Sequence, residues 1–500
     1  MKRICEAKKF VSHAVLAVLH RASGYFWMWL GIGLTALGFY LLSVLPCWNP
    51  GRVGLQATAL SCAIGVTAAK HLSGERISAS RWAGVLLVCF GVAVLWAAHG
   101  TGQMSFRMRL TGLRWLVLAL ACAPFAYYLL SVYSAWHFFR EHRRRGPATR
   151  DFMPLVSILK PVRGLDCEAY ENYSSFCRQD YPEYEILFAV SDADDPAIPV
   201  VQKLIYDFPE RSIRLLVGSE NLGPNNKVCK LCRLVSEARY ELLVISDSDV
   251  RVGTDYLRAV LSPFQDPEVG AVTCLYIGLA ARQLCAELEA IGIASEFFAS
   301  VLVARRLEGL KFALGATMAT TRQRLAEIGG FEAMVNQHSD DFELGHRIAA
   351  RGWRIELSPY TVSTGCPAQT LRAFFEHQLR WARTTRLSRP KGYLGLLLTY
   401  GLPWSLIAAA VAPSAALAAG YLGAYLVLRF LTAWTVGVWG MKDPVLRRKL
   451  WLLPLRDMLQ FFVWFSSIWS HRIVWRGAEF LVRKDCMVAV SSRSEDGWSG

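Results

Sequence analysis

Long apolar segments near both ends of the chain constrain its fold more than any other feature of the sequence. One group lies at residues 25–46, 54–69, 82–98 and 113–136, and a second lies at residues 393–412, 417–439 and 451–469. A helix needs roughly 20 apolar residues to cross the hydrocarbon core of a bilayer, and these segments reach or approach that length. Together with a hydrophobic content of 53%, they predict a membrane protein whose soluble part lies between two groups of helices.

Lysine and arginine residues beside these segments predict the orientation, because short cytoplasmic loops carry an excess of them. The basic stretches are residues 1–9, 70–81, 140–150 and 442–449. We therefore expect a multi-pass protein of the cell inner membrane with its soluble domain in the cytoplasm.

The segment 451–469 does not fit a simple crossing, since a crossing would place the basic residues that follow it outside. It is therefore expected to be re-entrant or interfacial. Arg456 and Asp457 within it could pair with each other. The serine-rich, acidic end, 486–500, is predicted to be disordered.

The formal charge of +15 and the pattern of the 13 cysteines bear on which ligands and partners the protein can have. No helix-turn-helix, zinc-finger or RNA-recognition pattern accompanies the positive charge, so no nucleic-acid partner is expected. Anionic lipid head groups and a diphosphate explain the charge better. The cysteines are scattered and form no disulfide framework, and Cys229-x-x-Cys232 lacks the second ligand pair that a zinc site needs.

Between the apolar groups, short apolar runs alternate with polar helical patterns, which is typical of an α/β fold with a mostly parallel sheet. The expected strands are residues 155–161, 185–190, 214–217 and 241–245. The predicted domains are a three-helix membrane extension (1–100), a transmembrane helix with a basic linker (101–150), the α/β domain with interfacial helices (151–390), C-terminal membrane helices (391–485) and the tail.

Two aspartates, Asp247 and Asp249, follow the fourth predicted strand directly. Alternate residues of an extended segment point the same way, so both carboxylates can bind one hard cation, Mg²⁺ or Mn²⁺, which would also contact the diphosphate of a sugar nucleotide. A simple turn or a helix N-cap is the alternative interpretation. Asp192 follows the second strand and is placed to accept hydrogen bonds from a uracil or a ribose.

A series of ordered motifs across residues 113–480 resembles ceramide glucosyltransferases and their bacterial relatives, including hopanoid-linked glycosyltransferases. The motifs are Lys160-Pro161-Val162-Arg163-Gly164, Gln179-Asp180-Tyr181-Pro182, Asp192, Gly223-Pro224-Asn225-Asn226-Lys227, Asp247-Ser248-Asp249, Asp341 and Arg380-Trp381. The resemblance implies a GT-A nucleotide-sugar domain in a membrane-anchored, inverting enzyme that uses a divalent cation. It also implies donor contacts for Asp192, metal and diphosphate contacts for Asp247 and Asp249, and a general base at Asp341.

The residues around Asp341 are also typical of a helix start, where carboxylates are favoured by the helix dipole. That preference alone could explain the acidic pair Asp340-Asp341. The further candidates for substrate binding are Lys160, Asn226 and Lys227.

On a predicted basic helix, Arg380 and Arg383 are spaced i, i+3, so both could bind phosphate oxygens of the leaving group. Trp381 offers a flat apolar wall near the sugar or the acceptor. His377 occupies a position where the resembled family usually has Gln or Arg, and it is a candidate for substrate binding. The same basic helix could also lie on anionic lipid.

These observations predict an inverting transfer of glucose from UDP-glucose to the hydroxyl of ceramide or a ceramide-like membrane lipid. The alternatives are a hopanoid or diacylglycerol glycosyltransferase that uses UDP-N-acetylglucosamine or UDP-glucose, and a processive polysaccharide synthase. The apolar segments 297–306 and 312–318 are expected to be core or the floor of an acceptor path.

A transporter is a further alternative, because residues 25–98 resemble part of a small drug/metabolite-type transporter. No acidic residue lies within the three spans of that region, which argues against coupled transport. An anchoring or partner-binding role is the preferred interpretation.

Overall fold

The computed structural model describes residues 103–145, 152–280, 282–366, 370–469, 472–475, 478–483 and 486–492. The predicted spans 25–46, 54–69 and 82–98, and with them the transporter-like region, lie outside the described residues. The chain divides into two compact units, Met1–Leu116 and Val117–Gly500. Of the first unit, the structure describes only the beginning of helix α4 (Gln103–Leu120).

A mixed eight-stranded sheet forms the centre of the second unit. Its strands are β1 (Val156–Pro161), β2 (Tyr184–Val190), β3 (Ser212–Val217), β4 (Leu242–Ile245), β5 (Val250–Arg251), β6 (Val269–Ala280), β7 (Met318–Thr321) and β8 (Arg354–Cys366). They lie in the order β3-β2-β1-β4-β7-β6-β8-β5, with β3, β2, β1 and β4 parallel to one another and β6 parallel to β8. The first four strands correspond to the predicted ones, and the expected mostly parallel α/β fold is confirmed.

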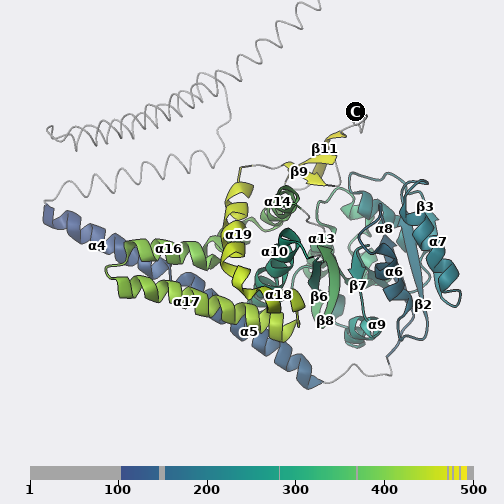
Figure 1. The fold of residues 1–500 in the computed structure, drawn as a ribbon. Coiled ribbons are helices and arrows are strands. Elements are labelled where there is room, and N and C mark those ends of the chain that lie inside the picture. Colours follow the sequence, from purple (N-terminus) through teal and green to yellow (C-terminus); the bar gives the residue numbers. More distant parts are fainter. Residues whose placement is uncertain are drawn as a thin grey trace, which may run out of the picture. The chain divides into compact units, whose positions relative to one another are not determined.

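Helices cover the sheet on both faces (Figure 1). They are α6 (Ala169–Cys177), α7 (Ala197–Asp207), α8 (Asn226–Glu237), α9 (Tyr256–Leu261), α10 (Leu284–Gly292), α11 (Phe298–Glu308), α12 (Arg322–Glu327), α13 (Asp340–Ala350) and α14 (Leu371–Ser388). Short 3₁₀ or π-helical turns lie at η1 (Ser262–Gln265), η2 (Ile293–Phe297) and η3 (Glu332–Met334).

Alternate residues of the central strands belong to two separate hydrophobic clusters, as expected where both faces of a sheet are covered. Leu159 and Leu243 lie in the cluster that contains α8, whereas their neighbours Ile158 and Val244 lie in the cluster that contains α6, α7 and α9. Burial on both faces explains why these strands are continuous apolar runs. Their carboxyl ends all meet at one edge of the sheet, where open α/β sheets bind ligands.

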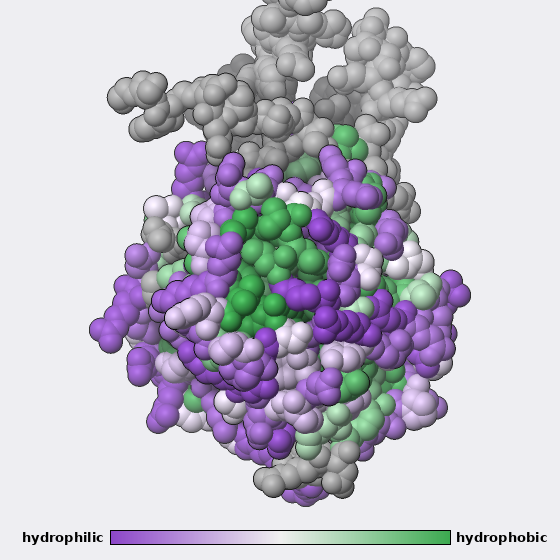
Figure 2. All heavy atoms as spheres, turned by 90° about the vertical axis from the view of Figure 1, so that its right-hand side faces the viewer, coloured by the Kyte–Doolittle hydropathy of each residue, from purple (hydrophilic) through white to green (hydrophobic). Residues whose placement is uncertain are grey.

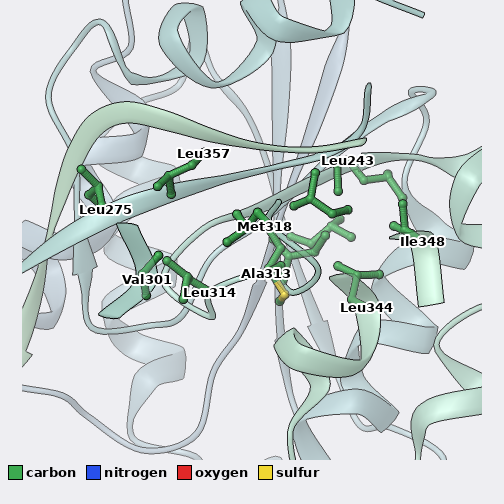
Figure 3. Packing of buried hydrophobic residues seen from close by; sticks show 14 of the residues in the cluster. Leu243, Leu275, Val301, Ala313, Leu314, Met318, Leu344, Ile348 and Leu357 are labelled. Carbon is green, nitrogen blue, oxygen red and sulfur yellow. The ribbon is translucent and has the colours of Figure 1, made fainter. Parts of the chain in front are cut away.

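The core beside β6 and β8 includes the two apolar segments 297–306 and 312–318. Figure 3 shows Val301 and Ala313 in this core with Leu344 from α13. The buried residues of both segments are therefore explained as core.

Hydrophobic residues also gather in one area of the surface on the side where β3 and α7 lie, with hydrophilic residues around them (Figure 2). Ile205 on α7 and Val217 on β3 are among the exposed hydrophobic residues. Apolar surface thus occurs on the α/β domain as well as on the helices expected in the membrane.

Apolar helices flank the α/β domain in the sequence. They are α4, α5 (Ala123–Arg145), α15 (Pro390–Gly395), η4 (Leu396–Thr399), α16 (Gly401–Val411), α17 (Ala415–Ala433) and η5 (Trp434–Gly440). Among the described residues, Thr111–Arg144 and Ala415–Gly440 are long and apolar enough to cross a membrane. The pair Pro390–Thr399 and Gly401–Val411, bent by 48°, is either a broken third span or a re-entrant loop. The predicted spans 113–136, 417–439 and 393–412 correspond to these segments. Helices α5, α16 and α17 lie side by side (Figure 1).

The C-terminal part contains α18 (Pro444–Lys449), η6 (Leu450–Leu452), α19 (Leu453–Ser467) and a three-stranded sheet of β9 (Arg472–Trp475), β10 (Ala478–Arg483) and β11 (Cys486–Ser492). Helix α19 covers most of the segment 451–469 and is not one of the candidate spans. Strand β11 occupies part of the segment 486–500 for which disorder was expected.

The expected pairing of Arg456 with Asp457 is wrong. Asp457 binds Arg429 of α17, and Arg456 binds Gln378 of α14. Adjacent residues of a helix point in directions about 100° apart, so they face different neighbours.

Candidate active site

Two carboxylates lie just beyond the end of β4, where the sequence predicted them. Asp249 is half-buried, and its Oδ2 accepts a hydrogen bond of 2.7 Å from Thr364 Oγ1 on β8. Between the two aspartates, Ser248 donates to the carboxylate of Asp166 in the loop after β1. Asp166, Asp247 and Asp249 therefore share one region at the edge of the sheet.

Negative charge is concentrated in this region. Burial, together with the neighbouring carboxylates of Asp247 and Asp166, raises the pKa of Asp249 to about 6. A carboxylate in such a place is stabilised in its charged form by a cation. The position therefore suits a positively charged ligand.

Lys227 connects two of the acidic segments. Its Nζ lies 2.7 Å from Asp247 Oδ1 and 2.8 Å from Asp340 Oδ2. Burial opposes the charged form of the lysine, but the two carboxylates outweigh it and raise the pKa of Lys227. The lysine thus remains charged and holds the start of α8 against the start of α13.

The start of α8 is fixed by a residue that the sequence reasoning did not select. Asn225 Oδ1 accepts hydrogen bonds from the backbone N–H groups of Lys227 and Val228, at 3.2 and 3.3 Å, as an N-cap does. Its Nδ2 donates to the carbonyl of Gln337 at 2.9 Å. Asparagine at a helix start could have been read as a cap, but its bond to the loop before α13 depends on the tertiary fold.

Asp341 lies in the first turn of α13 with its carboxylate held on both oxygens. Oδ1 accepts from Ser339 Oγ at 2.8 Å and from the N–H of Phe342 at 2.7 Å, and Oδ2 accepts from the N–H of Gly315 at 3.0 Å. A Cβ at Gly315 would lie 3.1 Å from Asp247 Oδ2 and 3.3 Å from Asp341 Oδ2. The carboxylates of Asp247 and Asp341 therefore approach the same point in space.

The close approach of the 312–315 segment to α13 requires a glycine in the helix. A Cβ at Gly345 would lie only 2.2 Å from the backbone nitrogen of Ala313. Gly345 therefore allows the segment to bring the N–H of Gly315 to Asp341.

Lys160 lies beneath the acidic residues, completely buried at the end of β1. Its Nζ donates to the carbonyl of Asp247 at 2.7 Å and lies 3.8 Å from the centre of the Phe176 ring. Burial lowers the pKa of Lys160 to about 7, although nearby carboxylates oppose the shift. In this position Lys160 supports the backbone of Asp247.

Asp192 and Asn226, predicted to bind the donor, are exposed at the neighbouring strand ends. Ser191 Oγ lies 3.2 Å from Ser219 Oγ and 3.5 Å from Asn226 Oδ1, which joins the loops after β2 and β3 to α8. These serines were not among the predicted site residues.

Asp195 is a further residue that was not predicted. It is buried and accepts from the N–H of Gly164 at 3.0 and 3.1 Å and from that of Ala197 at 2.9 Å. It thereby fixes the loop after β1, which leads to Asp166.

Helix α14 carries the predicted basic motif. His377 Nδ1 lies 2.9 Å from Glu289 Oε1 of α10, and its ring centre lies 4.7 Å from that of Trp381. Arg380 is half-buried one turn after His377. At the end of the helix, Ser388 Oγ lies 3.2 Å from His338 Nε2, just before α13.

Arg383, predicted to bind phosphate, donates from Nη1 to the carbonyl of Arg472 in β9, at 2.7 Å. The structure thus brings Lys160, Lys227, Asp247, Asp249 and Asp341 together and directs Arg383 to the C-terminal sheet.

The donor atoms suit Mg²⁺ or Mn²⁺, which bind carboxylate oxygens and complete their coordination with phosphate oxygens and water. Among the described residues, no group of three or more His, Cys, Asp or Glu side chains is arranged to hold a metal ion on its own. One or two carboxylates plus a diphosphate are sufficient for Mg²⁺. Asp247 and Asp249 fit that arrangement.

The chain is also similar in sequence to proteins of known function. Residues 115–488 match the family described as glycosyl transferase family 21. Ceramide glucosyltransferase 1 of Caenorhabditis elegans is 24% identical over 417 residues, which cover 77% of this chain and 86% of that protein. The ceramide glucosyltransferase of Gibberella zeae is 32% identical over 133 residues, 25% of each chain.

Among solved structures, the mannosyltransferase PcManGT from Pyrobaculum calidifontis, in complex with GDP-Man and Mn²⁺, gives a TM-score of 0.43 at 19% identity. The match covers 71% of this chain and 99% of that chain.

Proposed function

Because the chain belongs to glycosyl transferase family 21, we propose that it transfers glucose from UDP-glucose to the hydroxyl of ceramide or a ceramide-like membrane lipid, with inversion at the sugar carbon. The approach of Asp247 and Asp341 to one point beside Gly315 carries this proposal. The donor would be bound beside Asp247, and the acceptor hydroxyl would react beside Asp341, so both substrates would meet at this point.

On the donor side, Asp247 and Asp249 would hold Mg²⁺ or Mn²⁺ together with the diphosphate. The bound ion would neutralise charge on the leaving diphosphate. Lys227 fixes the position of Asp247, and Lys160 supports the same residue from below. The exposed Asp192 is assigned to the uracil or the ribose, beside Asn226.

On the acceptor side, Asp341 would act as the general base. The lipid oxygen attacks the anomeric carbon, its proton passes to Asp341, and the bond from that carbon to the diphosphate breaks on the opposite face. The N–H groups of Phe342 and Gly315 orient the carboxylate without neutralising its charge.

Helix α14 would supply further side chains for binding the donor. Arg380 is assigned to the leaving phosphate and Trp381 to the sugar or the acceptor, with His377 held against Glu289 as part of the same turn. Arg383 gives one N–H to the carbonyl of Arg472 in β9, and its other donors are assigned with Arg380 to the leaving phosphate.

The helices of spanning length would anchor the enzyme in the cell inner membrane, with the α/β domain on the cytoplasmic side. The exposed arginines Arg140, Arg143 and Arg144 at the end of α5 support that orientation. A lipid acceptor would then reach the site from the adjacent bilayer surface.

The test is a transfer assay with the full chain in lipid nanodiscs, supplied with UDP-glucose, ceramide and Mn²⁺. The expected result is release of UDP together with a hexosylceramide of inverted configuration, and loss of both on addition of a chelator. Mass spectrometry of the product, with hopanoid, diacylglycerol and UDP-N-acetylglucosamine in parallel assays, identifies the substrates. A wild-type chain that binds UDP but glycosylates none of these lipids would contradict the proposal.

A further inference from the structure

Helix α19 carries two adjacent charged residues that bind different helices. Both oxygens of Asp457 accept from the guanidinium of Arg429 in α17, at 2.8 to 3.1 Å, and Tyr425 Oη donates to Asp457 at 3.0 Å. Arg456 Nη2 donates to Gln378 Oε1 in α14 at 2.9 Å. Helix α19 therefore connects a candidate membrane span to the helix that carries the Arg-Trp motif.

The guanidinium of Arg456 has little freedom to move. Its Nη1 donates to Gln460 Oε1 on the same helix at 2.7 Å, and its Nη2 lies 3.6 Å from Glu296 Oε2. A Cβ at Gly292 would lie 2.3 Å from its Nε, so α10 packs directly against it. Only 4% of the Arg456 side chain is exposed. Several partners thus hold the donor that binds Gln378.

Gln378 is the neighbour of His377, and together they fix one turn of α14 from two sides. His377 pairs with Glu289 of α10, while Gln378 binds Arg456 of α19. The next turn begins with Arg380 and Trp381. A shift of the Gln378 side chain would therefore move the two residues assigned to the leaving phosphate and the sugar.

The segment formed by α10 and η2 also contacts both α14 and α17. Glu289 binds His377, and Ser295 accepts from Arg429 through its carbonyl at 3.1 Å. The same short segment thus contacts α14 on one side and the membrane span on the other. Asp457 and Arg456 are adjacent in the backbone of α19, so their separate contacts link Arg429 of α17 to Gln378 of α14.

We propose that Arg456 and Gln378 are positioning residues of the transferase: their hydrogen bond sets the place of Arg380 and Trp381 at the donor site. This inference rests on the proposed function, because it assigns α14 to the donor. The contact makes donor binding depend on a helix packed against the membrane-spanning part of the chain.

The test compares two substitutions of one buried residue in nanodiscs. Gln378→Leu removes the acceptor for Arg456 with little change in size, whereas Gln378→Glu keeps an acceptor there. We expect Gln378→Leu to lower kcat/KM for UDP-glucose roughly ten- to hundredfold, mainly through KM, and Gln378→Glu to stay within about threefold of wild type. Tyr425→Phe, which alters the same network away from α14, should leave KM unchanged.

Calorimetric titration of UDP with Mn²⁺ separates this inference from the proposed function. A wild-type chain that binds no UDP contradicts the proposed function itself. A wild-type chain that binds UDP, with Gln378→Leu binding equally well and showing the same KM, overturns the positioning role, as does an equal loss in Gln378→Leu and Gln378→Glu. If Gln378→Leu does not fold, Arg456→Lys replaces it. An increase in KM then supports the role, and an unchanged KM overturns it.

Discussion

The ammonium group of Lys227 lies 2.8 Å from Asp340, the residue next to the proposed base. Asp341 points elsewhere and accepts from the N–H of Gly315 at 3.0 Å. The two adjacent carboxylates thus have different environments, since one is paired with the half-buried Lys227 ammonium group and the other is held by neutral donors. This difference separates a structural aspartate from a candidate base.

Substitution of Asp341 by Asn should remove transfer and leave donor binding intact. Asparagine keeps the size and one oxygen of the side chain but cannot take a proton. General base catalysis contributes about 10² to 10⁴ in rate, so kcat should fall by that factor while the affinity for UDP stays near that of wild type. Measurement of kcat and of UDP binding on the same preparation checks both.

Asp340→Asn is the matched control for that substitution. It removes one of the two carboxylates that hold Lys227, so it should weaken donor binding more than it lowers kcat. If Asp340→Asn lost the larger factor in kcat and Asp341→Asn the smaller, the two roles would have to be exchanged.

Gly315→Ala should interfere with the site directly. The added Cβ would lie 3.1 Å from Asp247 Oδ2 and 3.3 Å from Asp341 Oδ2, which is tighter than ordinary contact, so both carboxylates must shift. We expect weaker Mn²⁺-dependent UDP binding and a loss of kcat/KM of roughly tenfold or more, with the protein still folded. Gly420→Ala, where a Cβ meets nothing within 4 Å, is the control and should match wild type. Equal activity of the two variants would show that the carboxylates do not need their present positions.

The sequence was informative where a function depends on the end of a secondary-structure element. Apolar runs marked β1 to β4, and carboxylates directly after β4 and at the start of α13 were recognisable for that reason. Asp247 and Asp341 could therefore be selected from the sequence. Their common approach to Gly315 could not, because the apolar pattern of the segment 312–318 indicated only core or the floor of an acceptor path.

The sequence was least informative about partners of buried charged residues. Arg429 lies in the apolar helix α17 and Asp457 in another helix, so only the packing of α17 against its neighbours shows that they pair. Asn225 and Asp195 stabilise loops through backbone groups that are distant in sequence. Such contacts follow from the tertiary fold and not from spacing along the chain.

Ionisation of Asp443 should lower the stability of the protein as the pH rises from about 4 to about 6. Burial raises the pKa of this aspartate to about 6, although its Oδ1 accepts from the N–H of Leu446 at 2.7 Å as an N-cap of α18. Because the folded state binds the proton more tightly than the unfolded state, ionisation of Asp443 disfavours folding as the pH rises through this range, by on the order of 3 kcal/mol.

Asp443→Asn should remove this contribution, since asparagine can still cap the helix but carries no charge. Above pH 6 the variant should have a higher Tm in nanodiscs than wild type, and the two should approach each other near pH 4. A variant whose Tm followed wild type in parallel over the whole range would show that Asp443 does not titrate in this way.

The buried pair of Arg429 and Asp457 should stabilise the chain only as a pair. Their side chains are 3% and 9% exposed, so removing one partner leaves a charge that is shielded from water and has lost its hydrogen-bonded counterion. Arg429→Met or Asp457→Leu alone should cost about 3–5 kcal/mol of folding free energy, whereas the double substitution should recover most of that loss. Thermal unfolding of the three variants in nanodiscs gives the coupling between the sites. Additive losses in the double variant would contradict the prediction and would indicate that each residue contributes through separate contacts, such as those of Arg429 with Ser295.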